Sequence, residues 1–528
     1  MKYTFNLLDK PWVPCTDSMG YLKTLSLNEL ISRAQTLSAI SSHLPVINAA
    51  IYQLVIALLS RVYTLTDLDD WEKLWKTGHF TQDKLASYTE KWHGRFNLLD
   101  EIFPFYQDSK IGFRAKDIKN LDKNDKPAEK SFTGHLLHLA SGSNATLFDH
   151  TLDSNETSYP LGLAAQYLVM LQAYSLGGMG VASIGKDKFY KDAAFSRGIF
   201  FLCRGDNLFE TLMRNLVPQS FNFMPSTEED IPCWERNDPF EPERSAPTGL
   251  IDLLTWQSRR IRLVPELKNG QVMVKNCFSA PGLSLAESFV NPFYLNEHAS
   301  DGEKQEVKLM RFQMNRALWR DSAAILDRDR RLEDKPVCKR LFEKLRFEGI
   351  LEDPFIRLVL SGTLTEPGKK KAYRYQEEVF NAPAVYLDRP DLYQQLQEAL
   401  ALAEAMRSCL YFATYTLASF KMYPEQDSKE SFSPDKKIVG ALYQHIEQEA
   451  FFWSRLEAPF YRLLNTLPIN ALALTEWKET LNKYIHESLA RAGELTGDDF
   501  AGLKARAKAE NRLFYEVSKR MNPEKKEE

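Results

Sequence analysis

Along the last quarter of the chain, apolar residues recur every three or four positions, the spacing of one face of an α-helix. Proline and glycine separate the stretches, and Pro459 is expected to kink the second helix or end it early. Closely linked amphipathic helices of this length favour packing as a four-helix bundle over residues 389–528. The four predicted helices are Asp391–Lys421, Ile438–Asn465, Ala471–Arg491 and Asp498–Arg520.

Before residue 389 the pattern mixes helix and strand signals. Alternating residues around a turn at Met19 and Gly20 predict a hairpin, and Ser26 with Glu29 has the form of a helix capping box. The fold class is therefore α+β: a mixed α/β domain over residues 1–388, followed by the four-helix bundle. Within the mixed domain we expect a helix at Leu161–Tyr174 and strands at Ser196–Cys203 and Leu253–Val264.

Composition narrows the class of protein. The 528 residues are 44% hydrophobic, which excludes disorder as the dominant state, and 67 basic against 71 acidic residues give a net charge of −4. Any nucleic-acid binding must therefore use local basic patches. The six cysteines are widely spaced without a CxxC pair, which argues against a zinc knuckle and a disulfide scaffold and favours a reducing cytoplasm. The apolar run Leu44–Tyr63 contains Arg61 and reads as a buried helix, so we expect no membrane contact. The first fifteen residues lack an uninterrupted apolar stretch, so we expect no signal peptide and a cytoplasmic protein.

A glycine-rich segment follows the predicted helix that ends at Tyr174. Gly180, Gly185 and Lys186 satisfy most of the P-loop pattern, but Asp187 stands where Mg²⁺ coordination needs a hydroxyl, and a P-loop follows a strand. A nucleotide site is therefore disfavoured. What remains is a flexible loop whose missing side chains allow another backbone to approach closely. It is either a plain helix exit or a surface that lies against DNA; its glycines are Gly177, Gly178 and Gly180.

Four residues have the types that bind metals: His135, His138, Asp149 and His150. His135 and His138 are three positions apart, which would place them on one helix face. Histidines in so apolar a helix are more often core or surface residues. No nucleophile motif accompanies them, so the sequence offers no convincing active site and no cofactor.

Basic residues cluster in three places. Between Lys308 and Arg346, 12 Lys and Arg stand against 6 Asp and Glu, which favours a salt-bridged helical surface. Arg260 and Arg262 share one face of a predicted strand and Arg259 lies on the other, so they contact phosphate or pair with carboxylates. A Pro-Gly turn carries three consecutive lysines that either neutralise phosphates or form a solvated loop: Lys369, Lys370 and Lys371.

Six segments occur in an order that is familiar. They are FNLLDKPWVPC at 5–15, FPFYQ at 103–107, SGSNATLFDHT at 141–151, the GGMG segment at 177–180, LTWQSRRIRL at 254–263 and EAFFWSRLEAPFYRLL at 449–464. Together they resemble the CasA large subunit (the Cas8e family) of type I-E CRISPR Cascade complexes. The resemblance spans essentially the whole chain, including a mixed domain followed by a terminal four-helix bundle.

The resemblance implies a non-catalytic DNA-recognition subunit in antiviral defence. Family members inspect the protospacer-adjacent motif (PAM) of double-stranded target DNA, help to start strand separation and R-loop formation, and recruit a helicase-nuclease. Their partners are crRNA and the backbone, handle-binding, small and crRNA-processing subunits of the complex. Base pairing then reads the long sequence and protein reads the short duplex tag.

Carried over residue by residue, the resemblance implies two segments that contact nucleic acid. The segment Asn144–His150 aligns with the family loop at the crRNA handle and PAM-proximal elements, and its candidate contacts are Asn144, Phe148, Asp149 and His150. The glycines of the GGMG segment match a small-residue loop that lies against the PAM duplex.

The chain departs from the family at the strand-separating wedge. In one branch a glutamine occupies a hairpin tip, whereas here the corresponding turn carries Lys369–Lys371 and the nearest glutamine is Gln376. We hypothesise that the lysines wedge or clamp phosphates. Lys275 is a candidate for the family's minor-groove lysine. In the bundle, Lys504, Arg506 and Lys508 are candidate basic contacts, although their spacing spreads them around the helix.

Two other classes of function remain open. One is a metal-dependent hydrolase that uses His135, His138, Asp149 and His150. The other is a purely architectural adaptor whose helical bundle is the docking surface.

Overall fold

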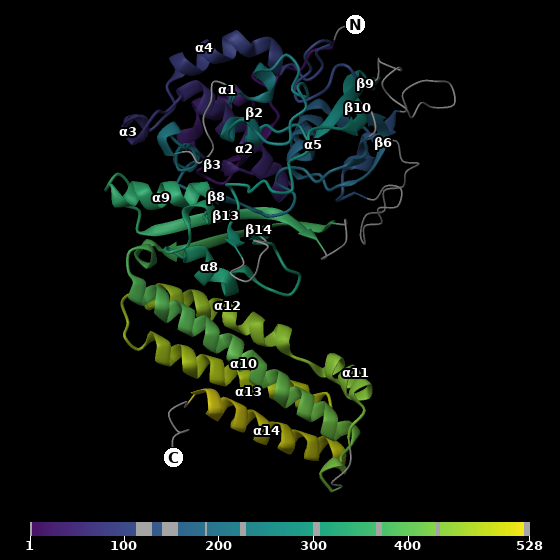
Figure 1. Cartoon of the computed structure of the whole chain (residues 1–528), viewed down its shortest axis with the longest axis vertical. Coiled ribbons are helices and arrows are strands. Elements are labelled where there is room, and N and C mark those ends of the chain that lie inside the picture. Colours follow the sequence, from purple (N-terminus) through teal and green to yellow (C-terminus); the bar gives the residue numbers. More distant parts are fainter. Residues whose placement is uncertain are drawn as a thin grey trace. The chain divides into compact units, whose positions relative to one another are not determined.

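The computed structural model of the 528-residue chain describes residues 3–111, 129–139, 157–184, 187–221, 229–298, 307–365, 372–428 and 433–521. The chain divides into two compact units (Figure 1). We call them the mixed unit, Met1–Met314 with Asp329–Asn381, and the helical unit, Asn315–Arg328 with Ala382–Glu528. The sequence predicted one boundary after residue 388. The division falls after Asn381 instead, and it assigns a short segment from the middle of the chain to the helical unit.

A three-stranded sheet with strand order β2-β1-β3 opens the mixed unit. The predicted hairpin is confirmed as β1 and β2, and the capping box at α1 is confirmed because the Glu29 N–H donates to Ser26 Oγ at 3.2 Å. The alternating residues before β1 form no strand and contribute only an isolated bridge between Asn6 and Asn97. The elements are β1 (Val13–Asp17), β2 (Leu22–Leu25), α1 (Leu27–Ser32) and β3 (Leu37–Ile40).

Two apolar helices that pack on each other form the core of the mixed unit. The prediction of α5 is confirmed, and α2 is the one helix among the described residues that is long and apolar enough to cross a membrane. Most of α2 is buried inside the unit, as expected of a core helix. The helices are α2 (Pro45–Tyr63), α3 (Leu68–Thr77), α4 (Gln82–Trp92), α5 (Leu161–Tyr174), α6 (Leu208–Met213) and α7 (Leu250–Leu254).

A long antiparallel hairpin, β9–β10, organises a second sheet. β10 pairs with β9 along one edge and with the short strands β4 and β5 along the other. The predicted strand at 253–264 is wrong in its first half: Leu253 and Leu254 end α7, residues 255–258 form a connection, and the strand begins only at Arg259. The elements are β4 (Lys130–Ser131), β5 (Tyr159–Pro160), β9 (Arg259–Lys268) and β10 (Gln271–Pro281).

A third sheet has the strand order β14-β13-β8, with α9 against β8. The strand predicted at 196–203 is confirmed from Ile199 onward. Two smaller hairpins complete the mixed unit, β6–β7 and β11–β12. The elements are β6 (Gly178–Ile184), β7 (Asp187–Tyr190), β8 (Ile199–Cys203), β11 (Asn296–His298), β12 (Val307–Leu309), α9 (Val337–Phe347), β13 (Phe355–Thr365) and β14 (Ala372–Pro383).

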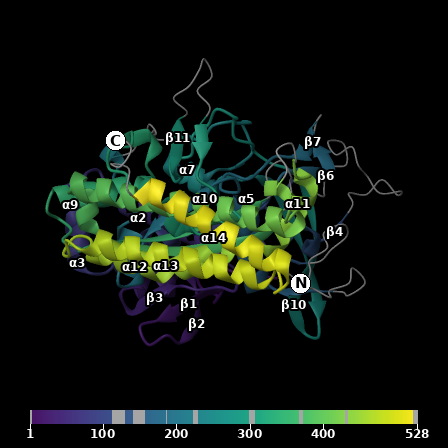
Figure 2. The ribbon, with the colours of Figure 1, turned by 90° about the horizontal axis from the view of Figure 1, so that it is seen from below.

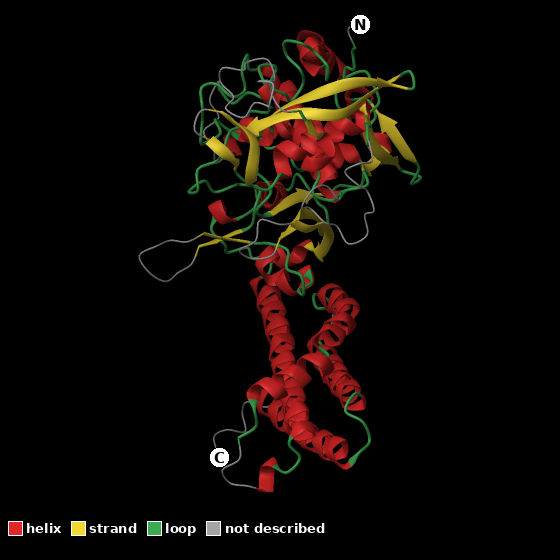
Figure 3. Cartoon of the chain, turned by 90° about the vertical axis from the view of Figure 1, so that its right-hand side faces the viewer, coloured by secondary structure: helices red, strands yellow, loops and turns green. Residues whose placement is uncertain are grey.

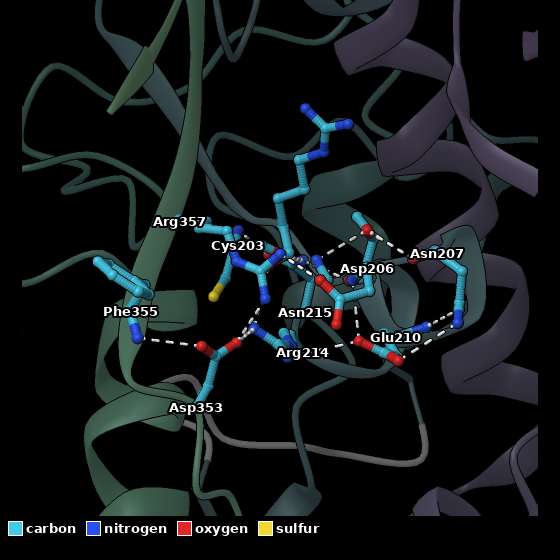
Figure 4. A network of polar contacts seen from close by, with 12 residues as sticks. Cys203, Asp206, Asn207, Glu210, Arg214, Asn215, Asp353, Phe355 and Arg357 are labelled. Atoms are coloured by element: carbon cyan, nitrogen blue, oxygen red, sulfur yellow. Dashed lines mark hydrogen bonds and ion pairs between the residues drawn. The ribbon is translucent and has the colours of Figure 1, made fainter. Parts of the chain in front are cut away.

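A partly buried polar network fixes the start of β13 (Figure 4). The Asp353 carboxylate accepts from the guanidinium groups of Arg214 and Arg357, each at 2.8 Å, and from the Phe355 N–H at 3.0 Å. Burial opposes ionisation of Asp353, but these three donors more than offset it, so the pKa of this carboxyl lies below its ordinary value. The network therefore ties β13 to the segment that carries α6.

Apart from Ala382 and Pro383, which end β14, the described residues of the helical unit form helices and loops (Figure 3). The sequence predicted one helix over 438–465; this is wrong, because Glu447 is extended and its carboxylate accepts the Glu449 N–H, which starts a new helix. Pro459 lies inside α12 without ending it, and Leu456 and Phe460 beside it are fully buried. The elements are α8 (Ser322–Leu326), α10 (Pro390–Met422), α11 (Lys436–Ile446), α12 (Glu449–Thr466), α13 (Ala473–Glu494) and α14 (Phe500–Met521).

Aromatic packing explains why Asn315–Arg328 belongs to the helical unit. The Trp319 ring is 1% exposed and stacks on Phe460 with centroids 4.7 Å apart. Arg320 reaches Glu404 on α10 at 2.6 Å and lies 3.7 Å from the Trp453 ring centroid. The α+β fold class is thus confirmed, a mixed unit followed by helices.

Candidate nucleic-acid interface

The glycine segment forms a strand. Gly178 and Gly180 lie in β6, which pairs antiparallel with β7 and opposes Gly178 to Tyr190. The predicted flexible loop is therefore wrong for these two glycines, and Gly177 directly precedes the strand. A P-loop remains disfavoured, because a P-loop follows a strand and this segment follows the helix α5, as the sequence indicated.

The two glycines at the base of this hairpin have different surroundings. A Cβ on Gly177 would lie 2.9 Å from the Tyr190 carbonyl oxygen and 3.1 Å from Asp192 Oδ1, which is closer than Cβ atoms pack. The Gly177 N–H also donates to that Asp192 oxygen at 2.5 Å. At Gly178, no described atom lies within 4 Å of such a Cβ. Gly177 is thus required by the chain's own packing, whereas Gly178 has free space where a side chain would stand, although its backbone is paired with β7.

The same hairpin exposes an aromatic side chain that was not predicted from the sequence. Phe189 on β7 is 56% exposed, while its neighbour Tyr190 is 8% exposed. Strand alternation sends these two side chains to opposite faces. Phe189 and Tyr190 are adjacent aromatic residues, so the sequence pattern does not indicate which of the two is exposed.

Two predicted features meet at β10, which lies on the same side of the mixed unit as β4, β6 and β7 (Figure 2). The β6–β7 hairpin packs against β10. The segment that contains Asn144, Phe148, Asp149 and His150 leaves from β4 and returns at β5, both on one edge of β10. These four residues themselves lie outside the described residues. The sheet therefore brings the roots of both predicted DNA- and crRNA-proximal segments to one strand.

Lys275 lies on β10 at an irregularity in the ladder. Val274 pairs with Pro265 and Asn276 pairs with Val264, so Lys275 is the residue at a β-bulge. Pro265 lacks an N–H and cannot complete a regular ladder, which accounts for the bulge at this position. Bulges redirect a side chain, and Lys275 is half-buried.

The lysine-bearing turn belongs to the third sheet. β13 ends at Thr365 and β14 begins at Ala372, so Lys369, Lys370 and Lys371 lie between two paired strands but outside the described residues. Gln376 donates to Glu378 Oε1 at 2.5 Å along β14. The Tyr375 ring lies 6.2 Å from that of His138, just before the handle-proximal segment.

The two predicted metal ligands that are described do not share a helix face. Phe132–His135 is a short 3-10 turn, and His138 follows it outside any helix. His135 Nε2 lies 3.1 Å from Ser279 Oγ, and burial together with the Arg259 charge lowers the pKa of His135 to about 4. Within the described ranges, no three His, Cys, Asp or Glu side chains gather as a metal site. Asp149 and His150 fall outside those ranges.

The three strand arginines are used inside the mixed unit. Arg259 is buried, whereas Arg260 and Arg262 lie on the other face, as the alternation predicted. Arg260 pairs with Asp108 at 3.0 Å, and Arg262 donates to the Ser109 carbonyl oxygen at 2.5 Å.

The other basic groups are also paired. In the 308–346 run, Lys335 and Lys339 both reach Glu343, at 2.9 and 2.7 Å, but both lysines are buried, so these ion pairs do not lie on the predicted helical surface. On α14, Lys504 and Lys508 each contact Asp427 at 2.8 Å. Arg506 pairs with Asp498 at 2.9 Å.

The architecture, a mixed unit with hairpins and a β10-centred sheet followed by a helical unit, is that of solved CRISPR-associated proteins. The chain belongs to the CRISPR-associated protein Cse1 family, whose model matches residues 6–488. It is 28% identical over 523 residues to CasA/Cse1 of Thermus thermophilus, and the match covers 96% of each chain. Crystalline Cse1 of Acidimicrobium ferrooxidans shares the fold with a TM-score of 0.78 at 23% identity, over 99% of each chain. A chain of a CRISPR RNA-guided surveillance complex does so with a TM-score of 0.73 at 16% identity, over 97% of this chain and 99% of that one. The family resemblance seen in the sequence is thereby confirmed.

Proposed function

We propose that this chain is the large, non-catalytic subunit of a type I-E Cascade complex, guided by crRNA. Family membership over residues 6–488 is the observation that carries the proposal. A fold shared with a chain of an RNA-guided surveillance complex supports it. The partners we propose are crRNA, the backbone, handle-binding, small and crRNA-processing subunits, and double-stranded target DNA.

Within this complex, we assign PAM recognition to the surface around β6, β7 and β10. Gly178 leaves open space where a side chain would stand, Phe189 offers an exposed ring, and Lys275 lies at the bulge of β10. A narrow hairpin with a bare backbone can approach a groove, and the minor groove offers only a degenerate code. Recognition there favours tolerance among related PAM sequences.

The later steps belong to the same proposal. The lysines between β13 and β14 clamp phosphates while the duplex opens into an R-loop, and the complex then recruits the helicase-nuclease. The six cysteines are free and buried, which supports a reducing, cytoplasmic location.

The test is target binding by the crRNA-loaded complex, with and without this chain, on duplexes with a randomised PAM. We expect PAM-dependent binding only when the chain is present, and the preferred motif comes from the same data. Binding that does not change when the chain is omitted contradicts the proposal and favours the architectural adaptor. DNA cleavage by the purified chain that requires a divalent metal would instead support the hydrolase.

A further inference from the structure

A buried arginine holds both ends of the β6–β7 hairpin. Arg259, the first residue of β9, is 4% exposed. Its Nη2 donates to the Leu176 carbonyl oxygen at 3.0 Å, directly before Gly177. Its guanidinium carbon lies 4.8 Å from the centroid of the Tyr190 ring, at the last residue of β7. One planar group therefore contacts the chain where it enters the hairpin and where it leaves.

Burying this arginine costs more free energy than burying an apolar side chain at the same place would. Its Nη1 donates to the Ser258 carbonyl oxygen at 2.8 Å, and the negative charge of Asp192 partly compensates its positive charge without a direct ion pair among the described residues. Burial lowers the pKa of Arg259 to about 10, so the group remains a cation at neutral pH. A buried charge opposes folding unless hydrogen bonds and a π face compensate it, and an apolar side chain would avoid that cost. The planar guanidinium makes directional contacts, which an apolar side chain cannot make. It therefore orients both the Leu176 carbonyl group and the Tyr190 ring.

A second set of contacts ties the same hairpin to β10. Tyr190 Oη lies 2.8 Å from Ser279 Oγ on β10, and that oxygen lies 3.1 Å from His135 Nε2. Tyr190 and Ser279 are both buried. The ring of Tyr190 thus faces Arg259 while its hydroxyl is anchored to β10.

The backbone of Arg259 is itself clamped by α5. Its N–H donates to Gln172 Oε1 at 2.8 Å, and Gln172 Nε2 donates back to its carbonyl oxygen at 2.8 Å. The arginine therefore transmits the position of the rigid core helix to the base of the hairpin.

We propose that Arg259 is a positioning residue for DNA recognition, which sets the Gly177–Gly178 backbone through Leu176 and Tyr190, with Ser279 and His135 as a second anchor. The inference rests on the proposed function, since it assigns a role within PAM reading. A surface that reads a groove with its backbone must be held within a fraction of an ångström, and polar contacts to rigid elements provide this.

Graded variants in the assembled complex test the proposal. Arg259→Lys keeps the charge but loses the planar group, Tyr190→Leu loses both contacts of the ring, and Tyr190→Phe keeps the ring and loses the hydroxyl. Arg244→Lys is the control, because Arg244 likewise lies against an aromatic ring in the mixed unit, Trp256 at 5.3 Å, although it differs from Arg259 in pairing with a carboxylate, Asp252 at 2.7 Å.

Each variant is measured on a duplex target and on the same target with the PAM-proximal base pairs already opened. We expect Arg259→Lys and Tyr190→Leu to weaken duplex binding by roughly tenfold or more and to leave the opened target within about twofold. Tyr190→Phe should lose less than Tyr190→Leu, and Arg244→Lys should not separate the two targets.

The outcomes are distinguishable. Equal losses of affinity for both targets, or an unfolded variant chain, would assign Arg259 a structural role only. Wild-type affinity of Arg259→Lys for the duplex would also overturn the inference. If the wild-type chain itself confers no PAM-dependent binding, the proposed function fails, independently of the variants.

Discussion

At the scale of single residues, Gly177 and Gly178 look equivalent in the sequence but are not equivalent in the structure. Gly178→Ala should leave the thermal stability of the chain unchanged, since no described atom lies near the new methyl group. If the bare backbone approaches DNA, the same methyl should weaken PAM-dependent duplex binding, by about tenfold for one poorly accommodated group. Gly177→Ala is the contrasting variant. Its Cβ meets the Tyr190 carbonyl oxygen at 2.9 Å, so stability should fall by about 1–3 kcal/mol.

The pair separates two reasons for a glycine. Unfolding by calorimetry and duplex binding by the complex are measured for both variants. Unchanged binding in Gly178→Ala would remove this position from the DNA surface and leave only the packing requirement at Gly177.

At the scale of elements, the β13–β14 hairpin is the place to test whether the lysines between its strands clamp phosphates. Replacing Lys369 and Lys370 by Ala should weaken duplex binding and reduce its salt dependence, with a slope smaller by about 0.9 for each lost phosphate contact. Target that is already opened should bind nearly normally. Lys436→Ala with Lys437→Ala is the control of equal charge, because both are exposed at the start of α11. Equal losses on duplex and opened targets would exclude a role in strand separation.

Other elements of the chain show how much of the fold a sequence can predict. The capping box at Ser26 and Glu29 was foreseen because its two hydrogen bonds join residues three positions apart. The glycine segment was misread as a loop because its strand depends on β7 and on an arginine 83 positions from Leu176. The break at Glu447 was missed because its residues continue the helical period, and only the conformation of one residue interrupts it. For the site, the resemblance supplied the segments, but their meeting on β10 required the strand pairing.

At the scale of the whole molecule, the helical unit is completed by a segment from far upstream in the sequence. Trp319, from Asn315–Arg328, is fully buried against Phe460 of α12, so the fold of the unit depends on residues that precede β13 and β14. Trp319→Ala should therefore destabilise the helical unit by about 3–5 kcal/mol, the usual cost of deleting a buried large aromatic. Hydrogen exchange should rise in α10 and α12 and stay unchanged in β8 and β13, because the cavity opens inside one unit. Phe412→Ala on α10 is the control, since that ring is 39% exposed and its loss should alter exchange little. Faster exchange in both units after Trp319→Ala would mean that the chain unfolds as one cooperative body. The two units would then not be independent in their stability.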